Sequence, residues 1–312
     1  MNKKHAYLIM AHNDFQILIE ILKELDHERN DIFLHIDKKT LEFPEQKIKN
    51  AVKKGRLFLV PRMSVFWGGY SQIECEYRLM QYAANKGNYA YYHMTTGAIF
   101  PLKSQKEILE FFDEHAGYEF IGYDNSDDYS GRVKKYNIFN EIGKATTKID
   151  QLKAFCRNKF RGFQGKVGFV YRPARGIEFK KGFVYWSLTE DAIKYALEKY
   201  KWVRKVFKHS FCGDELFMQT IIYNSEFKEK IYDYKDEYRS CMRYAKPAQS
   251  WSPQFSGSSI KQANQFETGI CSDDIEKCLK SNMLFGFKFV GETGLDAIKC
   301  LRKLSLQIKS QG

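Results

Sequence analysis

Two adjacent acidic residues, Asp214 and Glu215, stand at the start of an amphipathic run over residues 216–222. Gly213 or Asp214 can cap the first turn of a helix there, and the positive end of the helix dipole favours an ionised carboxylate at Glu215. Such a carboxylate is suited to accept a proton as a general base. An acidic pair that only caps an ordinary helix gives the same pattern, so the surrounding segments must decide between the two interpretations.

A second chemical group is Lys288, which interrupts the apolar run over residues 284–289. A buried charge without a partner is costly, so this lysine is expected to meet an anion, and a bound phosphate would supply one. The chain contains no Gly-x-Gly-x-x-Gly, no Gly-x-x-x-x-Gly-Lys-Ser/Thr and no Asp-x-Asp. Carboxylates are the usual ligands of a divalent metal on a diphosphate. We therefore expect cationic side chains, and no metal, to neutralise any diphosphate bound here.

The first 123 residues alternate between short apolar runs and helical periods. Strands are predicted over residues 6–11, 32–36, 57–60, 89–94 and 118–122, and helices over residues 14–25, 71–84 and 104–112. This alternation predicts right-handed βαβ units and an α/β fold with a mostly parallel sheet. Further along, residues 181–188 are predicted to form a strand and residues 189–199 a helix capped by Thr189.

Ligands of such sheets bind beyond the carboxyl ends of the strands. The residues at those ends are Ala11 and His12 after the first strand, Asp37 after the second, and Thr96 and Gly97 after the strand at 89–94. Polar residues at the end of a single strand are often only solvated loop residues. Three groups at one edge of a sheet indicate a ligand site.

The 312 residues carry a formal net charge of +12, which favours an anionic partner: a nucleotide diphosphate, an anionic lipid surface or nucleic acid. The seven cysteines are scattered and form no Cys-x-x-Cys pair, as is typical of a reducing compartment. The apolar run at residues 6–11 is too short for a signal peptide or a membrane span. These features predict a cytoplasmic protein that can lie peripherally on a membrane.

Between residues 153 and 181, arginines and lysines alternate with aromatic residues. This composition suits a surface for anionic lipid or for single-stranded nucleic acid, and a loop-rich insertion with buried aromatic residues is a third interpretation. No nucleic-acid-binding module is recognisable, and the segments with chemical residues lie elsewhere. We therefore expect peripheral contact with the inner face of the cell membrane and no nucleic-acid partner.

Six segments, taken in order, resemble those of a known family. They are His35-Ile36-Asp37-Lys38-Lys39, residues 65–71, 96–104, 183–190 and 213–220, and Leu284-Phe285-Gly286-Phe287-Lys288-Phe289. Their order and spacing are similar to the core-2/I-branching β-1,6-N-acetylglucosaminyltransferases, a family that also contains the peptide O-xylosyltransferases. The resemblance extends from about residue 6 to about residue 302.

The resemblance implies one catalytic domain with the GT-A fold, in which a Rossmann-like nucleotide half, residues 1–123, is fused to an acceptor half, residues 124–312. It implies inverting, metal-independent transfer of a sugar, N-acetylglucosamine or alternatively xylose, from a UDP-sugar to a glycan hydroxyl. A bacterial, cytoplasmic member that acts on cell-surface polysaccharide precursors or lipid-linked oligosaccharides is expected. A glycan-binding member without turnover is the alternative, and the presence of Glu215 argues against it.

The resemblance also assigns the catalytic and phosphate-binding residues. Glu215 matches the acid that closes the family's Pro-Asp-Glu segment and is implied to be the general base, while Gly213 replaces the proline. Asp214 and Glu119 are the reserve candidates for that role. Lys288 and Arg243 are implied to meet the diphosphate, and Arg239 and Lys246 remain rivals of Arg243.

The remaining assignments concern the two substrates. Asp37, Ala11 and His12 are implied to face the uridine of the donor. The acceptor side is implied to include Arg132, Lys135, Trp67, Thr96 and Gly97.

Overall fold

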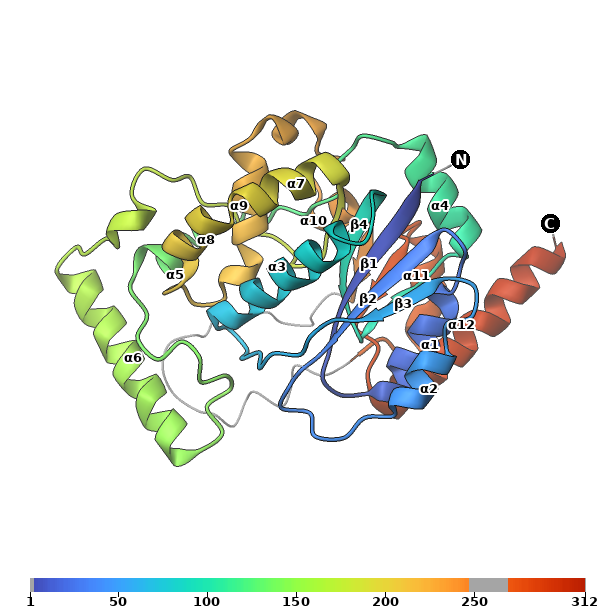
Figure 1. The fold of residues 1–312 in the computed structure, drawn as a ribbon, viewed down its shortest axis with the longest axis horizontal. Helices are drawn as coiled ribbons and strands as arrows, with labels where there is room; N and C mark the ends of the chain where they lie inside the picture. The colour runs from blue at the N-terminus through green and yellow to red at the C-terminus, as the bar shows by residue number, and fades with distance from the viewer. Residues whose placement is uncertain (1–2, 247–268, 312) are drawn as a thin grey trace.

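A five-stranded sheet with the order β3-β2-β1-β4-β6 runs through the computed structural model, which describes residues 3–246 and 269–311 (Figure 1). Its strands are β1 (Lys4–Ala11), β2 (Asn30–Ile36), β3 (Arg56–Leu59), β4 (Tyr89–Thr96) and β6 (Ser187–Thr189). The pairs β1–β2, β1–β4 and β2–β3 are parallel, and β6 is antiparallel to β4. The predicted α/β fold with a mostly parallel sheet is confirmed.

The sheet separates two apolar cores. Along β1, Ala6 and Leu8 belong to one core and Tyr7 and Ile9 to the other, as the alternation of side chains along a strand requires. β2 is buried along its whole length, which is typical of a parallel strand covered on both faces. Both cores contain residues from before and after residue 123. The division into a nucleotide half and an acceptor half stays a prediction.

Helices cover both faces of the sheet (Figure 1). One core contains side chains of α3 (Tyr70–Ala84), α7 (Glu190–Glu198), α8 (Tyr200–Phe207) and α9 (Phe217–Tyr223), and the other contains side chains of α1 (Phe15–Leu25), α4 (Gln105–Glu114) and α12 (Gly291–Gln311). The further helices are α2 (Glu45–Asn50), α5 (Gly131–Lys134), α6 (Lys148–Lys166), α10 (Glu237–Cys241) and α11 (Ile275–Lys280), with short 3-10 turns at Arg172–Ala174, Gly213–Glu215, Glu226–Lys230 and Ser272–Asp274.

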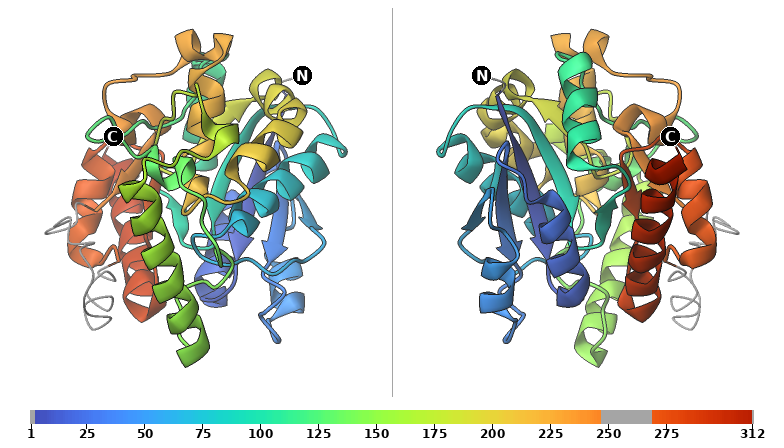
Figure 2. Two further views of the ribbon diagram at one scale, coloured as in Figure 1. Left: turned by 90° about the vertical axis from the view of Figure 1, so that its left-hand side faces the viewer. Right: turned by 90° about the vertical axis from the view of Figure 1, so that its right-hand side faces the viewer.

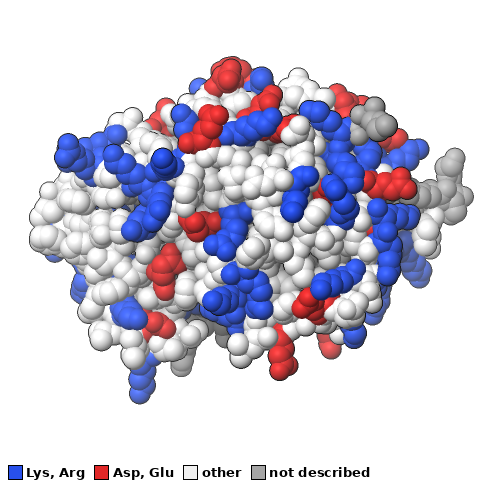
Figure 3. Space-filling model, in the orientation of Figure 1, with Lys and Arg blue, Asp and Glu red and all other residues white. Residues whose placement is uncertain are grey.

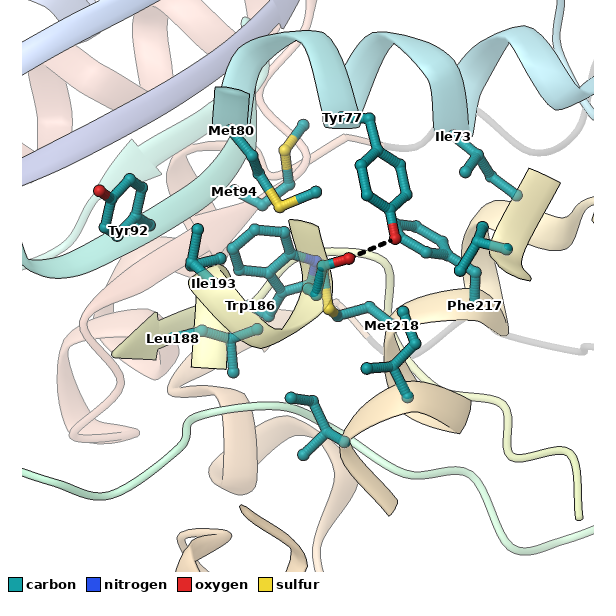
Figure 4. Packing of buried hydrophobic residues seen from close by; sticks show 14 of the residues in the cluster. Ile73, Tyr77, Met80, Tyr92, Met94, Trp186, Leu188, Ile193, Phe217 and Met218 are labelled. Atoms are coloured by element: carbon teal, nitrogen blue, oxygen red, sulfur yellow. Dashed lines mark hydrogen bonds between the residues drawn. The ribbon is translucent and has the colours of Figure 1, made fainter. Parts of the chain in front are cut away.

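Trp186 anchors the first of these cores, under α3 (Figure 4). Its side chain is fully buried, together with Met80 and Met94. Nearby, the hydroxyl of Tyr77 donates a hydrogen bond of 2.9 Å to the carbonyl of Ala196, which ties α3 to α7. This packing fixes the segment before β6, on which part of the candidate site depends.

A second sheet has the order β5-β8-β7, from β5 (Ile99–Pro101), β8 (Phe285–Phe287) and β7 (Arg243–Ala245). β8 is antiparallel to β5 and parallel to β7. The amide of Phe289 donates to the carbonyl of Ala98 over 2.9 Å. The C-terminal segment 284–289 is therefore placed directly beside the end of β4.

Most of the predicted elements are present, but two strands differ. Residues 118–122 form isolated bridges at Glu119 and Phe120, so the strand predicted there is wrong. Of the strand predicted at 181–188 only the end, in β6, pairs with the sheet, because nearby backbone groups bond elsewhere: Gly182 donates to Glu215 and Lys181 accepts from Asp124. The helix predicted at 189–199 is confirmed as α7, and the Thr189 hydroxyl caps it by accepting from the amide of Ala192.

The basic, aromatic segment contains a long helix, α6, which starts at Thr147, whose side chain accepts from the amide of Asp150. In the left view of Figure 2, α6 lies in front of the other described elements. Among the described residues, no helix is both long enough and apolar enough to cross a bilayer. Residues 247–268, which belong to the predicted acceptor half, lie outside the described residues.

Candidate active site

Glu215 ends the 3-10 turn Gly213–Glu215, one short step before α9 begins at Phe217. Its carboxylate oxygen Oε2 lies 2.5 Å from a terminal nitrogen of Arg132, which comes from α5. The Glu215 side chain is 31% exposed, so a substrate hydroxyl can reach it. Burial opposes the charge of Arg132, yet the Glu215 carboxylate raises the pKa of that guanidinium above its ordinary value.

Asp214, the neighbour of Glu215, is in a different environment. It is buried and accepts a hydrogen bond of 2.9 Å from the Gln72 side chain. Burial, followed by the charge of Glu215, raises the pKa of Asp214 to about 7. The two adjacent carboxyl groups therefore suit different roles. Asp214 is buried and holds its proton more tightly, whereas Glu215 is accessible to a substrate.

Glu119, the other reserve candidate for the base, lies away from these groups. Its carboxylate accepts from the amide of Thr189 at 2.9 Å and from the Thr189 hydroxyl at 2.5 Å. Thr189 pairs with Tyr91, near the start of β4, whereas Gly97 follows the end of that strand. Glu119 therefore caps the junction of β6 and α7 and takes no part in the candidate site.

The ends of β1, β2 and β4 lie at one edge of the sheet, as predicted. The amide of Asp37 donates to the carbonyl of Ala11 at 2.9 Å, and the amide of Gly97 donates to the carbonyl of Met10 at 3.0 Å. A methyl group on Gly97 would lie 3.3 Å from the Cβ of Ala11, so the close approach of the two loops favours glycine. His12 is exposed beside them.

The loop after β2 is held in place by a residue that the sequence did not single out. Arg62 donates to the carbonyls of Ile36 and Asp37 at 3.1 and 2.7 Å. The Asp37 carboxylate accepts from the amide of Lys39 at 2.9 Å and pairs with its ammonium group at 3.3 Å. Arg62 stands three residues after β3, and nothing in its local pattern distinguishes it from any other surface arginine.

Lys288 reaches the same edge from the far end of the sequence. It precedes Phe289, whose amide bonds to Ala98, the residue after Gly97. Lys288 makes no ion pair with any residue that the structure describes. Lys246 follows β7 as Lys288 follows β8, and the parallel register of Ala245 with Phe287 brings both lysines to the same end of the second sheet.

Arg243 is placed differently from its expected role. Its side chain is 1% exposed, stacks over the ring of Phe285 at 5.0 Å, and donates to the carbonyls of Cys241 and Trp186. Burial lowers the pKa of Arg243 to about 10. The two terminal nitrogens of Arg243 bond to backbone carbonyls, whereas its buried Nε has no hydrogen-bond partner among the described residues. The side chain is enclosed, and its role at a diphosphate stays a prediction.

Its rivals are more accessible. Lys246 forms an ion pair with Asp274 at 2.7 Å, and 30% of its side chain is exposed. Arg239 pairs with Asp233 at 2.9 Å. Because Lys246 lies at the same end of the second sheet as Lys288, the geometry favours Lys246 as the second diphosphate cation.

Tyr185, which the sequence did not single out, connects the two parts of the site. Its ring lies 5.5 Å from the ring of Phe287 in β8 and 5.1 Å from that of Phe183. Burial raises the pKa of Tyr185 above its ordinary value, and the charges of Asp214 and Glu215 raise it further. The Tyr185 ring thus packs on β8, within the electrostatic reach of the acid pair. In the sequence, Tyr185 is only one of several aromatic residues in an extended segment, and no motif marks it as a site residue.

The predicted acceptor residues lie in three places, of which the end of β4, with Thr96 and Gly97, is described above. Trp67 is half exposed and packs edge-on against Phe211 with 5.9 Å between ring centres, and the amide of Phe211 donates to the carbonyl of Arg132. Trp67 and Arg132 therefore lie on the Glu215 side of the site. The ammonium group of Lys135 instead approaches Gly165 of α6.

A further set of charges surrounds Glu215. Lys181 pairs with Asp124 at 2.9 Å, and its ammonium group lies 4.6 Å from the ring centre of Tyr129, which Arg132 also faces at 5.2 Å. Burial raises the pKa of Glu237 to about 7 against the opposing charge of Lys181. These groups can bind sugar hydroxyls, because both donors and acceptors are present.

Within residues 3–246 and 269–311, no group of three or more potential His, Cys, Asp or Glu ligands is close enough to hold a metal ion. The lysines that follow β7 and β8 add positive charge beside the strand edge, where Asp37, Lys39 and Arg62 already lie. A cationic pair, a carboxylate and a Rossmann-like strand edge together suit transfer chemistry on a phosphorylated donor.

The model of the family described as Core-2/I-Branching enzyme matches residues 5–265. The chain belongs to this family of glycosyltransferases. The match includes Glu215, Arg132 and Lys246 but ends before the segment 284–289. The position of Lys288 in the site therefore rests on the pairing of β8 with β5 and β7.

Similar curated proteins include xylosyltransferase 2 of dog (Canis lupus familiaris) and of human (Homo sapiens), each 22% identical over 239 residues, and that of rat (Rattus norvegicus), 21% identical over the same length. Each alignment covers 73% of this chain and 25% of the relative, so the chain spans about a quarter of the length of the curated relatives it matches. Among solved structures, apo mouse xyloside xylosyltransferase 1 is 10% identical, with a TM-score of 0.37, over 82% of this chain and 91% of that chain.

Proposed function

We propose that the protein is an inverting glycosyltransferase that transfers a sugar from a UDP-sugar to a hydroxyl of a glycan acceptor. The observation that supports this most is the accessible Glu215 carboxylate, which is 31% exposed and is held by the guanidinium of Arg132. Family membership and the parallel strand edge point in the same direction, and we extend the GT-A description of the family to this chain.

The chemistry is a single displacement. Glu215 accepts the proton of the acceptor hydroxyl while its oxygen attacks the anomeric carbon, and the bond from that carbon to the diphosphate breaks as UDP leaves. General-base assistance of this kind contributes about 10²–10⁴ in rate. Lys288 and Lys246 stabilise the charge that develops on the phosphate oxygens, as preorganised cations do in other transferases.

The donor side is formed by Ala11, His12 and Asp37, and the acceptor side by Arg132 and Trp67. We propose N-acetylglucosamine as the transferred sugar, with xylose as the alternative because the curated relatives are named xylosyltransferases. We further propose that the reaction needs no metal ion. The two lysines supply the positive charge that a divalent cation supplies elsewhere.

We place the reaction in the cytoplasm of a bacterial cell, where it would extend precursors of cell-surface polysaccharides or lipid-linked oligosaccharides. The seven unpaired cysteines support a reducing compartment.

The test is a thermal-shift screen of UDP and of UDP-linked N-acetylglucosamine, xylose, glucose and galactose, with and without EDTA. A ligand at 100 times its dissociation constant stabilises the folded state by about 2.7 kcal/mol. The donor that shifts the midpoint is then supplied with oligosaccharide acceptors, and release of UDP is measured. Binding without turnover would make the protein a glycan-binding member of the family. Loss of turnover in EDTA with recovery in manganese would overturn the metal-free mechanism.

A further inference from the structure

Helix α6 packs on the rest of the described chain with its polar face. The side chain of Gln164 is buried and both donates to and accepts from the backbone of Tyr136 at 2.8 Å. Arg157 and Arg161 face the ring of Phe211 at 4.7 and 5.6 Å. The two arginines at the centre of the basic, aromatic segment therefore point toward the protein and not toward solvent.

The opposite face of α6 is apolar and exposed. We call this face the α6 stripe. Its side chains recur at intervals of three to eight residues along one side of the helix and at its end. They are Ile149, Leu152, Phe160, Phe163 and Val167. Their side chains are between 37% and 67% exposed. A helix on the surface of a globular protein normally turns its apolar face toward the core, so this arrangement is reversed. Contiguous exposed apolar surface marks an interaction site.

Lysines border the stripe. Lys148, Lys159 and Lys166 lie along one side of it by helical spacing, and Lys153 lies on the other. Asp150 is the helix's single acidic residue, and it lies on the polar side. In Figure 3 the left-hand side of the molecule shows an uncharged area with Lys and Arg side chains above and below it. The surface is thus an apolar band with a cationic border.

We propose that α6 binds an anionic lipid bilayer, with the α6 stripe inserted among the headgroups and the bordering lysines on the lipid phosphates. Apolar and aromatic side chains on one face with lysines beside them are the features that hold a helix in the plane of a membrane interface. A second copy of this chain fits less well, because both copies would bring the same lysines together and each chain carries a net charge of +12.

Binding through α6 would orient the candidate active site. The inner face of α6 rests on Phe211, whose ring also contacts Trp67 and whose amide bonds to Arg132. The acceptor side of the site is therefore a neighbour of the helix that meets the bilayer. If the proposed function holds, and this step rests on it, the acceptor glycan is attached to a lipid of the same membrane.

The test is sedimentation of the full chain with vesicles of phosphatidylglycerol and phosphatidylcholine in equal amounts, and with vesicles of phosphatidylcholine alone. The stripe variant is Leu152→Gln with Phe163→Gln. Its matched control is Leu41→Gln with Leu306→Gln, two apolar side chains that are 90% and 70% exposed outside α6. All substituted positions are exposed, so thermal midpoints are expected to match that of the wild type.

At low salt we expect the wild type and the control to sediment with the anionic vesicles, and the stripe variant to bind them at least about tenfold more weakly. High salt is expected to weaken binding, because charge attraction is screened within about 10 Å at 0.1 M. Equal binding to pure phosphatidylcholine would overturn the choice of an anionic surface.

Wild-type protein that stays in the supernatant, or a stripe variant that sediments like the control, would overturn the proposal. So would a concentration-dependent dimer that the stripe variant abolishes while vesicle binding is unchanged. UDP stabilisation and transfer to a water-soluble acceptor are measured on the same variants. A failure of the transferase assignment would then appear in all variants alike, and a failure of the membrane proposal would appear in the vesicle data alone.

Discussion

The guanidinium of Arg132 contacts the carboxylate of Glu215 across 83 residues of sequence. The contact joins α5 to the turn before α9, and charge-assisted hydrogen bonds of this type also fix geometry. The sequence analysis assigned Arg132 only to the acceptor side. The contact adds a second role, which is to hold the Glu215 carboxylate. Glu215 is held by a cation on one side and open to solvent on the other.

Glu215→Gln is expected to lower turnover by about 100-fold or more while UDP binding and the thermal midpoint stay near those of the wild type, because only the proton acceptor is removed. Initial rates of UDP release and a UDP titration measure the two effects. Glu178→Gln, an exposed glutamate of the same half of the chain, is the control. Full activity in Glu215→Gln would move the search for the base to Asp214.

Arg132→Met is expected to lower kcat with little change in the affinity for UDP, since Arg132 holds Glu215 whereas Lys246 and Lys288 are the proposed diphosphate cations. Arg132→Lys is expected to recover part of the rate, because an ammonium group keeps the charge but lacks the planar fork of a guanidinium. Arg175→Met, at an exposed position, is the control. An equal loss of UDP affinity and kcat in Arg132→Met would place this residue on the donor.

Lys288→Ala and Lys246→Ala are each expected to weaken UDP binding more than uridine binding. A charge-assisted contact to a phosphate contributes about 1.5–3 kcal/mol, which corresponds to more than about tenfold in the dissociation constant. Isothermal titration with both ligands measures the difference. Lys280→Ala, on the exposed side of α11, should leave both affinities unchanged. Equal losses for UDP and uridine would show that the substituted lysine does not contact the phosphates.

Asp214→Asn is expected to reduce the pH dependence of stability. The folded state raises the pKa of Asp214 from 3.8 to about 7. It therefore holds the proton more tightly than the unfolded chain, and the free energy of unfolding falls as the pH rises from about 4 to about 7, by up to about 1.4 kcal/mol per pH unit for this group.

Asparagine keeps an oxygen for the Gln72 hydrogen bond but binds no proton. Urea unfolding at several pH values measures the slope, with Asp273→Asn as the exposed control. Glu119 and Glu237, whose pKa values burial also raises to about 7, leave a residual dependence in the variant. A slope identical to that of the wild type would show that Asp214 is ionised in the folded protein at pH 5.

The sequence was sufficient where local patterns determine structure. The period of apolar residues predicted α1, α3, α4 and α7, and the strand ends at Ala11, Asp37 and Gly97 were placed at one edge because parallel strands share a direction. The helix that follows Glu215 was predicted from its neighbours alone, but the cap predicted at Gly213 or Asp214 is wrong, because Glu215 ends a separate 3-10 turn and α9 begins only at Phe217. These inferences need only a few consecutive residues.

It was insufficient where the outcome depends on contacts between distant segments. Arg243 and Lys246 are three residues apart, and only the pairing of β7 with β8 shows that the first is buried and the second lies beside Lys288. The strand predicted at 118–122 has the right composition but lacks a continuous partner. Tyr185 carries no motif, and its packing against Phe287, about 100 residues further along the chain, follows from the fold.

The pairing of β8 between β5 and β7 also has a consequence for biosynthesis. The strands that carry Ala11, Asp37 and Gly97 leave the ribosome early, whereas Lys288 follows Glu215 by a further 73 residues, as their numbers show. A nascent chain that already presents Glu215 still lacks Lys288. The second sheet can close only after residues 285–287 have been made, because β8 lies between β5 and β7, so the strand edge is formed well before Lys288 can join it.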